Sequence, residues 1–134
     1  MEKNSGLYGK KILVVDDVSI NRKIVRNVIT ARGGSVVCAK NGADALNLFE
    51  QSYSGEFSVI LMDIRMPKMD GYETTIAIRS SKHSDSARIP IIALSSERPE
   101  EVGDLCLKSG MNLHMEKPFS PEKLISEIIK LSSK

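Results

Sequence analysis

The chain has 134 residues, of which 41% are hydrophobic and 27% are charged, and its formal net charge is +2. This composition is that of a globular protein with room for one domain and one core, and it excludes an intrinsically disordered chain. So small a charge, with no basic run between aromatic residues, argues against a nucleic-acid partner. No apolar run is long enough for membrane contact through a spanning helix, so we expect a cytoplasmic protein whose cysteines, Cys38 and Cys106, stay reduced.

Short apolar runs alternate along the chain with amphipathic segments. Five runs are predicted to be strands: 12–15, 35–39, 59–62, 91–94 and 113–115. The continuous apolar runs 12–15 and 59–62 are expected to be buried on both faces of a parallel sheet. Five segments are predicted to be helices: 19–32, one that follows Asn41-Gly42, 72–80, one from Pro99 to Gly110, and one that begins at Ser120-Pro121.

The first helix has a predicted cap and a predicted buried stripe. Ser19 has a side chain suited to an N-cap. The spacing of Ile20, Ile24, Val28 and Ala31 places these four residues on one side of the helix, which we expect to face the core.

Strict alternation of strand and helix predicts an α/β fold. We expect a flavodoxin-like, doubly wound sheet of five parallel strands in the order 2-1-3-4-5, with five helices covering its two faces. In this order the first and third strands are neighbours at the switch point. Their carboxyl ends therefore border one crevice, which is where open α/β sheets bind ligands.

Polar residues follow the predicted strands at this same edge. Asp16 and Asp17 come after the first strand and Asp63 after the third, while Ser95 and Lys117 follow the last two. Two carboxylates about 4 Å apart repel each other by roughly 4 kcal/mol at an effective dielectric near 20, so such a cluster needs a counter-charge, a proton or a metal. Carboxylate oxygens with open positions beside them favour Mg²⁺. A metal, a lysine and a hydroxyl around one carboxylate suit phosphoryl transfer to that carboxylate, although isolated aspartates are often only helix caps or loop charges.

Four motifs carry a resemblance to a known family. They are Ile12–Asp17, Leu61–Gly71, Ile91–Ser95 and Lys117–Phe119. In this order they resemble the receiver (CheY-like) domain of two-component response regulators, over nearly all of the chain from Lys10 to Leu131. The resemblance implies a receiver domain at 10–134, preceded by a linker or tail at 1–9.

The resemblance implies a chemical role for the acidic residues. Asp63 would accept a phosphoryl group from a histidine kinase or a histidine phosphotransfer protein. Asp16, Asp17, Asp63 and the backbone carbonyl of Arg65 would hold Mg²⁺ or Mn²⁺. The chain is then expected to be a phosphoacceptor signalling domain and not an enzyme, although it would assist its own phosphorylation and dephosphorylation.

The same resemblance implies how the phosphoryl group is held and how the signal leaves. Ser95 and Lys117 would bind the phosphoryl oxygens, and the bond between Lys117 and Pro118 is expected to be cis. The segments 16–22 and 66–71 look most like those of receivers in hybrid sensor kinases. A downstream protein partner is expected to bind the last two strand-helix units.

Four further residues are weighed with the resemblance in view. His114 stands three residues before Lys117, where the family usually has a Tyr or Phe that reports phosphorylation, but an ordinary histidine at a strand edge fits equally well. Arg65 and Glu97 stand where family members tune the lifetime of the aspartyl phosphate, and we expect them to form an ion pair across the mouth of the site. His83 lies in a polar loop and is expected to be exposed.

Two alternative functions stay open from the sequence alone. A Mg²⁺-dependent phosphatase with an aspartate nucleophile usually has a second aspartate two residues later, and here that residue is Arg65. A receiver-like module that binds a protein without being phosphorylated is the other alternative, but the complete set of five site residues disfavours it.

Overall fold

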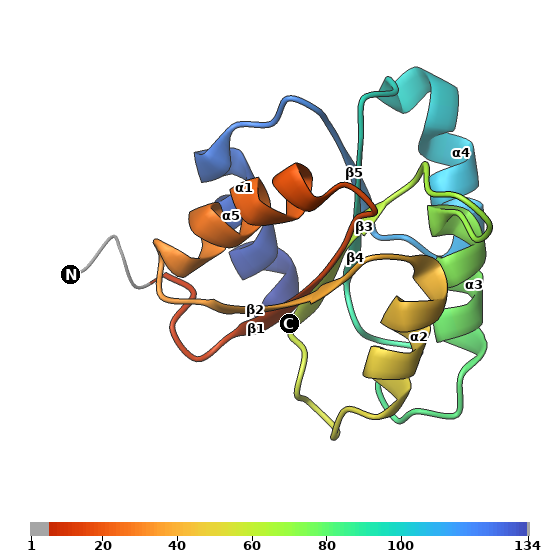
Figure 1. Cartoon of the computed structure of the whole chain (residues 1–134), viewed down its shortest axis with the longest axis horizontal. Coiled ribbons are helices and arrows are strands. Elements are labelled where there is room, and N and C mark those ends of the chain that lie inside the picture. Colours follow the sequence, from red (N-terminus) through yellow and green to blue (C-terminus); the bar gives the residue numbers. More distant parts are fainter. Residues whose placement is uncertain (1–5, 134) are drawn as a thin grey trace.

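A single parallel sheet runs through the computed structural model, with helices on both of its faces (Figure 1). Residues 6–133 are described. The strands are β1 (Lys11–Val15), β2 (Ser35–Ala39), β3 (Val59–Asp63), β4 (Ile91–Ser95) and β5 (Leu113–Glu116). The helices are α1 (Ser19–Thr30), α2 (Gly42–Glu50), α3 (Gly71–Ser80), α4 (Pro99–Ser109) and α5 (Pro121–Ser132). Within residues 6–133, no helix is both long and apolar enough to cross a bilayer.

The order of the strands is β2-β1-β3-β4-β5, which confirms the predicted flavodoxin-like topology. All five residues of β3 and of β4 are buried, because helices cover both faces of the sheet. This is why the two central strands are continuous apolar runs in the sequence. In the parallel register Val15 pairs with Met62 and Asp63 pairs with Leu94, so the strands end at the same edge.

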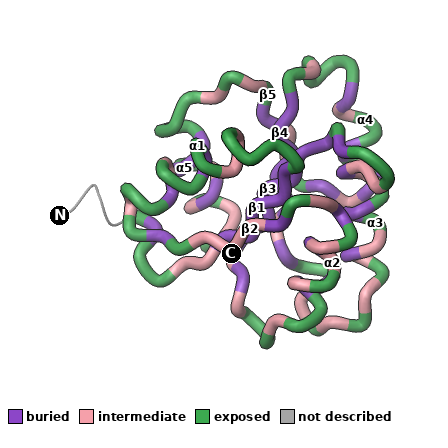
Figure 2. The backbone as a smooth tube through the Cα atoms, viewed as in Figure 1, coloured by how far each residue is buried: buried purple, intermediate pink, exposed green. Residues whose placement is uncertain are grey.

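Two apolar layers hold the helices against the sheet, and Figure 2 shows their buried backbone at the centre of the molecule. On one face Phe49 of α2, Ile78 of α3 and Val102 of α4 pack over the sheet. On the other face Ile29 of α1 and Leu124 of α5 do the same. The second cluster consists mainly of branched aliphatic side chains, and the first also contains Phe, Met and Ala residues. The burial of such apolar side chains is the main favourable term in folding.

Three helices have side-chain N-caps, whereas α1 lacks the N-cap that the sequence predicted. The side chains of Asn41, Asp70 and Ser120 accept hydrogen bonds from backbone N–H groups in the first turns of α2, α3 and α5. The prediction for Ser19 was wrong, because Ser19 is the first residue of α1 and not its cap. The cap is Val18, which makes no side-chain hydrogen bond to the helix.

The buried side of α1 also differs from the predicted stripe. Ile20 and Ile24 are 57% and 50% exposed, and the buried residues are Val25 and Ile29. The apolar residues of α1 cover more than one side of the helix, so two stripes with helical spacing were available. Contact with the sheet selects Val25 and Ile29, and of the predicted stripe only Val28 packs against this core, whereas Ala31 is exposed. Ile24 instead lines a surface groove beside the loop that follows β5.

A half-buried arginine fixes the end of α4. Arg79 of α3 donates two hydrogen bonds to the carbonyl oxygen of Gly110, from Nε at 3.0 Å and from Nη2 at 2.7 Å. Its Nη1 donates to the carbonyl of Ser86, and its Nη2 also donates to Oδ1 of Asn112. Three of these hydrogen bonds tie α3 to the turn between α4 and β5, and the fourth ties it to the segment that precedes β4.

The segment before β1 contributes to the core. Leu7 is fully buried in the layer of α1 and α5. Its backbone N–H donates to the carbonyl of Arg32, and its carbonyl accepts from the N–H of Lys10. Residues 6–9 lie within the segment expected to be a linker or tail, and residues 1–5 fall outside the described part of the chain.

A glycine allows α3 to begin directly against the end of β3. A Cβ atom on Gly71 would lie 2.8 Å from Cα of Ile64 and closer still to the carbonyl oxygen of Asp63. The N–H of Gly71 donates to the carbonyl of Ile64, which holds the two segments together. The neighbouring atoms belong to the backbone of β3 and the residue after it, and they cannot move aside as a flexible side chain could. Only glycine therefore fits here without displacing Asp63.

We predict that Gly71→Ala destabilises the fold by about 1–3 kcal/mol, the usual cost of overpacking a close contact. Gly103→Ala is the matched control, because Gly103 lies inside α4 and a Cβ atom added to it would have nothing within 4 Å. That change should stabilise the protein by about 0.5–1 kcal/mol through helix propensity. Equilibrium unfolding in urea measures both, and a Gly71→Ala variant as stable as the parent contradicts the close approach.

Candidate functional site

Three aspartates meet at the carboxyl edge of the sheet. Asp16 and Asp17 follow β1 directly, and Asp63 is the last residue of β3. One carboxylate oxygen from each lies within 4.8 Å of the others. Asp16 is 5% exposed and Asp63 is 7% exposed, whereas Asp17 is on the surface. The predicted convergence of these side chains is therefore present in the structure.

Local hydrogen bonds fix the direction of Asp16. Its Oδ1 accepts from the N–H of Val18 at 2.9 Å, and its backbone carbonyl accepts from Nη1 of Arg22 at 2.7 Å. Its other carboxylate oxygen lies 3.5 Å from Nζ of Lys117. Arg22 was not singled out from the sequence, where its place in the first turns of α1 gives no sign of this contact.

The pKa of Asp63 shows the electrostatic state of the cluster. Burial is the largest cause that raises this pKa, from 3.8 to about 6, and the negative charge of Asp16 raises it further. The ammonium of Lys117 and the backbone N–H of Arg65 act in the opposite direction. Desolvation and like charge therefore outweigh the available positive charge.

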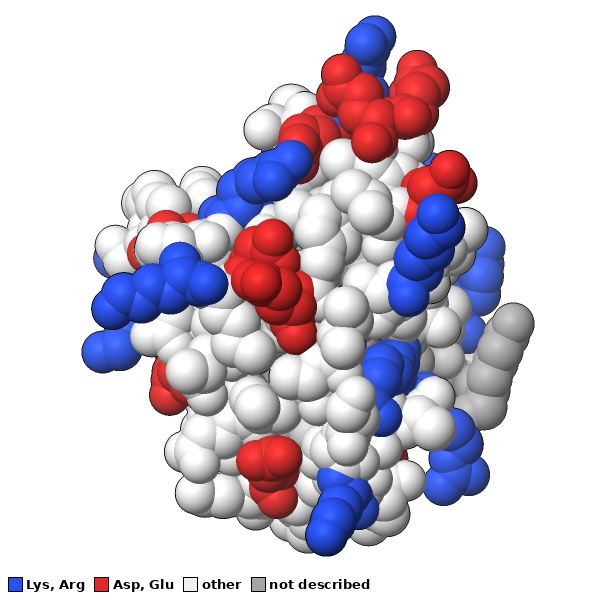
Figure 3. All heavy atoms as spheres, turned by 90° about the vertical axis from the view of Figure 1, so that its right-hand side faces the viewer, with Lys and Arg blue, Asp and Glu red and all other residues white. Residues whose placement is uncertain are grey.

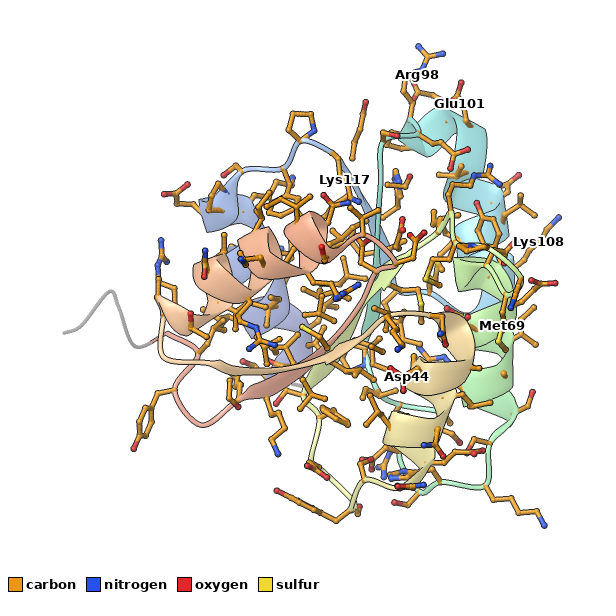
Figure 4. The ribbon with its side chains drawn as sticks, in the orientation of Figure 1. Asp44, Met69, Arg98, Glu101, Lys108 and Lys117 are labelled. Carbon is orange, nitrogen blue, oxygen red and sulfur yellow. The ribbon has the colours of Figure 1, made fainter. Side chains whose placement is uncertain are left out.

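Lys117 and Ser95 complete the edge on its other side. Figure 4 shows Lys117 in the loop after β5, near the end of β1. Its ammonium contacts the Asp16 carboxylate. The N–H of Lys117 donates to the carbonyl of Ser95 at 2.7 Å, which fixes the start of that loop against the end of β4. The peptide bond between Lys117 and Pro118 is cis, as predicted.

A chain of contacts leads from the edge strand β5 to the loop after Asp63. Nε2 of His114 lies 3.0 Å from Oγ of Ser95, and that oxygen also accepts from the N–H of Glu97 at 3.1 Å. The Glu97 carboxylate pairs with the guanidinium of Arg65, with Nε donating at 3.1 Å. The predicted ion pair is therefore confirmed, and the Arg65 side chain is largely exposed. Burial lowers the pKa of His114, although Glu116 and Glu97 oppose this shift.

His83 lies away from this edge and corrects a prediction. Its side chain is 6% exposed and not exposed as expected. The ring packs on Phe49 with centroids 4.5 Å apart, and Nδ1 accepts from the N–H of Asp85 at 2.9 Å. Nε2 lies 2.8 Å from the carbonyl of Ser52, so His83 joins two loops. The polar sequence around it gave no sign of these long-range partners.

The rim of the site carries charges of both signs. Figure 3 shows acidic side chains gathered over the start of α4, where Glu100 and Glu101 occupy the first turn. Lys40 and Lys68 line a separate hollow that also contains Asp17. Lys68 has φ 70°, a left-handed backbone conformation in the loop between β3 and α3.

The kind of ligand atom at this edge of the sheet determines which metal ion it can bind. Asp16, Asp17 and Asp63 offer oxygen ligands alone, from carboxylates that repel one another, and Lys117 lies beside Asp16. Hard divalent cations such as Mg²⁺ bind such oxygens, and they prefer sites that leave room for water and phosphate. The residues present therefore fit a magnesium site beside a carboxylate, a lysine and a hydroxyl.

The chain is similar to known proteins over nearly its whole length. Residues 12–129 match the family model of the response regulator receiver domain. Histidine kinase 3 of Arabidopsis thaliana is 33% identical over 91% of this chain and 13% of its own length. Hybrid signal transduction histidine kinase I of Dictyostelium discoideum is 35% identical over 93% of this chain and 7% of its own length. The chain thus spans only a small part of these curated relatives.

Solved structures agree with the sequence relatives. The receiver domain of a sensor histidine kinase from Pseudomonas aeruginosa has a TM-score of 0.84 at 30% identity, and covers 94% of this chain and 99% of its own. That structure holds a magnesium ion in its active site cleft. A chemotaxis protein of Vibrio cholerae has a TM-score of 0.82 at 30% identity, over 91% of this chain and 98% of its own. With the fold, the acidic edge and the matching family model in agreement, this chain belongs to the response regulator receiver domain family.

Proposed function

We propose that this chain is the phosphoacceptor of a two-component phosphorelay, in which Asp63 takes a phosphoryl group from a phosphohistidine. The observation that carries this proposal is a buried carboxylate at the sheet edge, facing two further aspartates and a lysine. In the transfer an Asp63 oxygen attacks phosphorus, the bond from phosphorus to the imidazole nitrogen breaks, and the electron pair leaves with that nitrogen. The product is an aspartyl phosphate.

The acidic neighbours of Asp63 have a part in this reaction. Asp16, Asp17, Asp63 and the backbone carbonyl of Arg65 are the proposed ligands of Mg²⁺ or Mn²⁺. The cation would supply positive charge that lets an anionic phosphoryl group approach three carboxylates. The hydrogen bond from Val18 and the contact with Lys117 hold Asp16 in place for this role.

Two further side chains are proposed to bind the phosphoryl oxygens. Lys117 offers an ammonium 3.5 Å from Asp16, and it is free to exchange this contact for a phosphoryl oxygen. Ser95 offers a hydroxyl at the end of the neighbouring strand. Charge-assisted hydrogen bonds from these groups are stronger than neutral ones, so the phosphoryl group should draw both toward it.

The proposed partners follow from the relatives and from the surface. The relatives named above are histidine kinases, one of them hybrid, so the proposed phosphodonor is a histidine kinase or a histidine phosphotransfer protein. For the downstream protein we propose the face of β4, α4, β5 and α5, where Leu105 and Leu107 are 52% and 68% exposed. The free thiols of Cys38 and Cys106 suit a cytoplasmic setting.

A role as acceptor, and not as an enzyme acting on free substrates, fits the site better than a phosphatase. The position two residues after Asp63 holds Arg65, whose side chain is engaged with Glu97. A phosphatase would need a proton donor for the leaving group near this point. A guanidinium does not supply one, because it stays protonated at any ordinary pH.

We predict that a small phosphodonor such as acetyl phosphate adds one phosphoryl group to this protein, and only when Mg²⁺ is present. Intact-mass spectrometry measures the gain, which should vanish in Asp63→Asn and in the presence of a chelator. Asp104→Asn is the matched control, because Asp104 is an exposed carboxylate on α4. Labelling retained in Asp63→Asn disproves the nucleophile, and no labelling of the parent favours a receiver-like interaction module.

The raised pKa of Asp63 predicts how metal-free stability depends on pH. A folded-state pKa near 6 against 3.8 means that the folded protein holds this proton more tightly, so the stability contributed by the proton is full below about pH 4 and is lost as pH rises through 6. Between pH 5 and 7.5 the parent should lose about 1 kcal/mol relative to Asp63→Asn.

Urea unfolding with a chelator at both pH values measures this loss. Mg²⁺ at pH 7.5 should then stabilise the parent more than Asp63→Asn, since the cation offsets the repulsion that the mutation removes. An equal pH dependence in the two proteins would show that Asp63 ionises like an ordinary surface carboxylate.

The ion pair of Arg65 and Glu97 is proposed to slow hydrolysis of the aspartyl phosphate. The two side chains are 66% and 26% exposed, so the pair contributes only about 0–1 kcal/mol to stability, and its effect would be to obstruct the attacking water. Arg65→Ala and Glu97→Ala should each speed the loss of phosphate by about 2- to 5-fold, which corresponds to about 0.4–1 kcal/mol in the barrier.

The decay of the phosphorylated mass at constant pH measures this rate. A double-mutant cycle separates a joint effect from independent ones, because the double variant should decay no faster than either single variant if the pair acts as a unit. Arg98→Ala is the control, since Arg98 forms a comparable exposed pair with Glu101 at 3.5 Å. Unchanged decay in both single variants would reduce the pair to two solvated charges.

A further inference from the structure

The hydroxyl of Ser95 contacts His114 of the edge strand β5, which lies on the other side of β4 from β3. His114 pairs with Ala93 in the register of β4 and β5, and Ser95 lies two residues further on the same face. The small side chain of Ala93 leaves room for the imidazole ring, whose Nε2 comes within 3.0 Å of the Ser95 oxygen. That oxygen also accepts the N–H of Glu97.

A count of hydrogen-bonding groups selects the tautomer of His114. Nδ1 is buried and has no partner among the described residues. If Nε2 carried the proton, the Ser95 oxygen would accept two hydrogen bonds, and both its own proton and the Nδ1 lone pair would lack partners. If Nδ1 carries the proton, Ser95 donates to Nε2, and a single group is unsatisfied. Since each unsatisfied buried group is costly, the second arrangement is favoured.

We propose that His114 is a positioning residue that latches Ser95 in the resting state, with the neutral imidazole accepting the only proton of the Ser95 hydroxyl. An anion at Asp63 then has to replace His114 as the acceptor of this hydrogen bond before Ser95 can donate to the anion. The latch itself is a property of the unphosphorylated protein, and only the identity of the anion rests on the proposed function. His114 therefore opposes the movement of the Ser95 hydroxyl toward the anion, and it occupies the position of the family's aromatic reporter.

The contact between His114 and Ser95 also affects the loop that follows β4. The N–H of Glu97 shares the Ser95 oxygen, and the Glu97 carboxylate holds Arg65 in the loop after Asp63. Release of Ser95 therefore loosens the start of the β4–α4 loop as well as the edge strand β5. A phenylalanine or tyrosine ring at position 114 has no ring nitrogen that could accept the proton of Ser95. Ser95 could then move without breaking this hydrogen bond.

The imidazole nitrogens of the unphosphorylated protein give the first test. Two-bond ¹H–¹⁵N correlation spectra at neutral pH distinguish the two tautomers, and this chain has only two histidines. His114 should carry its proton on Nδ1, and its Nε2 signal should shift in Ser95→Ala. His83 is the internal control with the opposite tautomer, because its Nδ1 accepts from Asp85. An Nε2-protonated His114 overturns the latch, whether or not the protein is ever phosphorylated.

The second test uses beryllofluoride with Mg²⁺ as a phosphoryl mimic. His114→Phe keeps a ring and removes the acceptor, so half-saturation should need about 2- to 10-fold less mimic, the effect of losing one competing hydrogen bond. His114→Gln offers an acceptor oxygen and should restore the parent value in part. In a Ser95→Ala background His114→Phe should have no effect on binding.

The outcomes of the second test separate the two proposals. Binding by His114→Phe that is equal to or weaker than that of the parent contradicts the latch. If the parent itself binds no mimic in the presence of Mg²⁺, the proposed function fails, and the tautomer of His114 still decides the latch.

Discussion

Repulsion among carboxylates at the end of a buried parallel sheet is the constraint on which the rest of this molecule depends. The register of β1 with β3 brings Asp16 and Asp63 to one edge, and their burial makes the shared negative charge costly. Lys117 is a neighbouring cation, yet burial and the negative charge of Asp16 together still raise the pKa of Asp63. The fold thus maintains a site whose lowest energy requires an added positive charge or proton.

Packing supplies the rigidity that this arrangement needs. β3 and β4 are buried along their whole length, and buried strands are tightly packed. The polar residues at the ends of these strands therefore cannot move apart to relieve their repulsion. Gly71 lets α3 begin against the backbone of Asp63, and the backbone bond from Lys117 to Ser95 fixes the other side. The favourable free energy of burying the two apolar layers offsets the repulsion between the carboxylates at the edge.

Parallel strands explain why so much was predictable from the sequence. Strands covered on both faces are continuous apolar runs, and the residue after each run is thereby placed at a known edge, which brought Asp16, Asp63 and Ser95 together. Contacts between segments far apart in the chain were not predictable. Three features depend on which segments the fold brings together. They are the hydrogen bonds of Arg79, the burial of His83 and the burial of Val25 on α1.

The burial of Leu7 determines where this domain can be cut out of a longer polypeptide. The family match begins at residue 12 and β1 begins at Lys11, so a boundary drawn from either would remove a fully buried leucine and its backbone bond to Arg32. Loss of one such side chain from a core costs about 2–5 kcal/mol. A fragment intended to fold on its own, or a fusion designed to transmit strain into this unit, must therefore keep the residues from Gly6 onward.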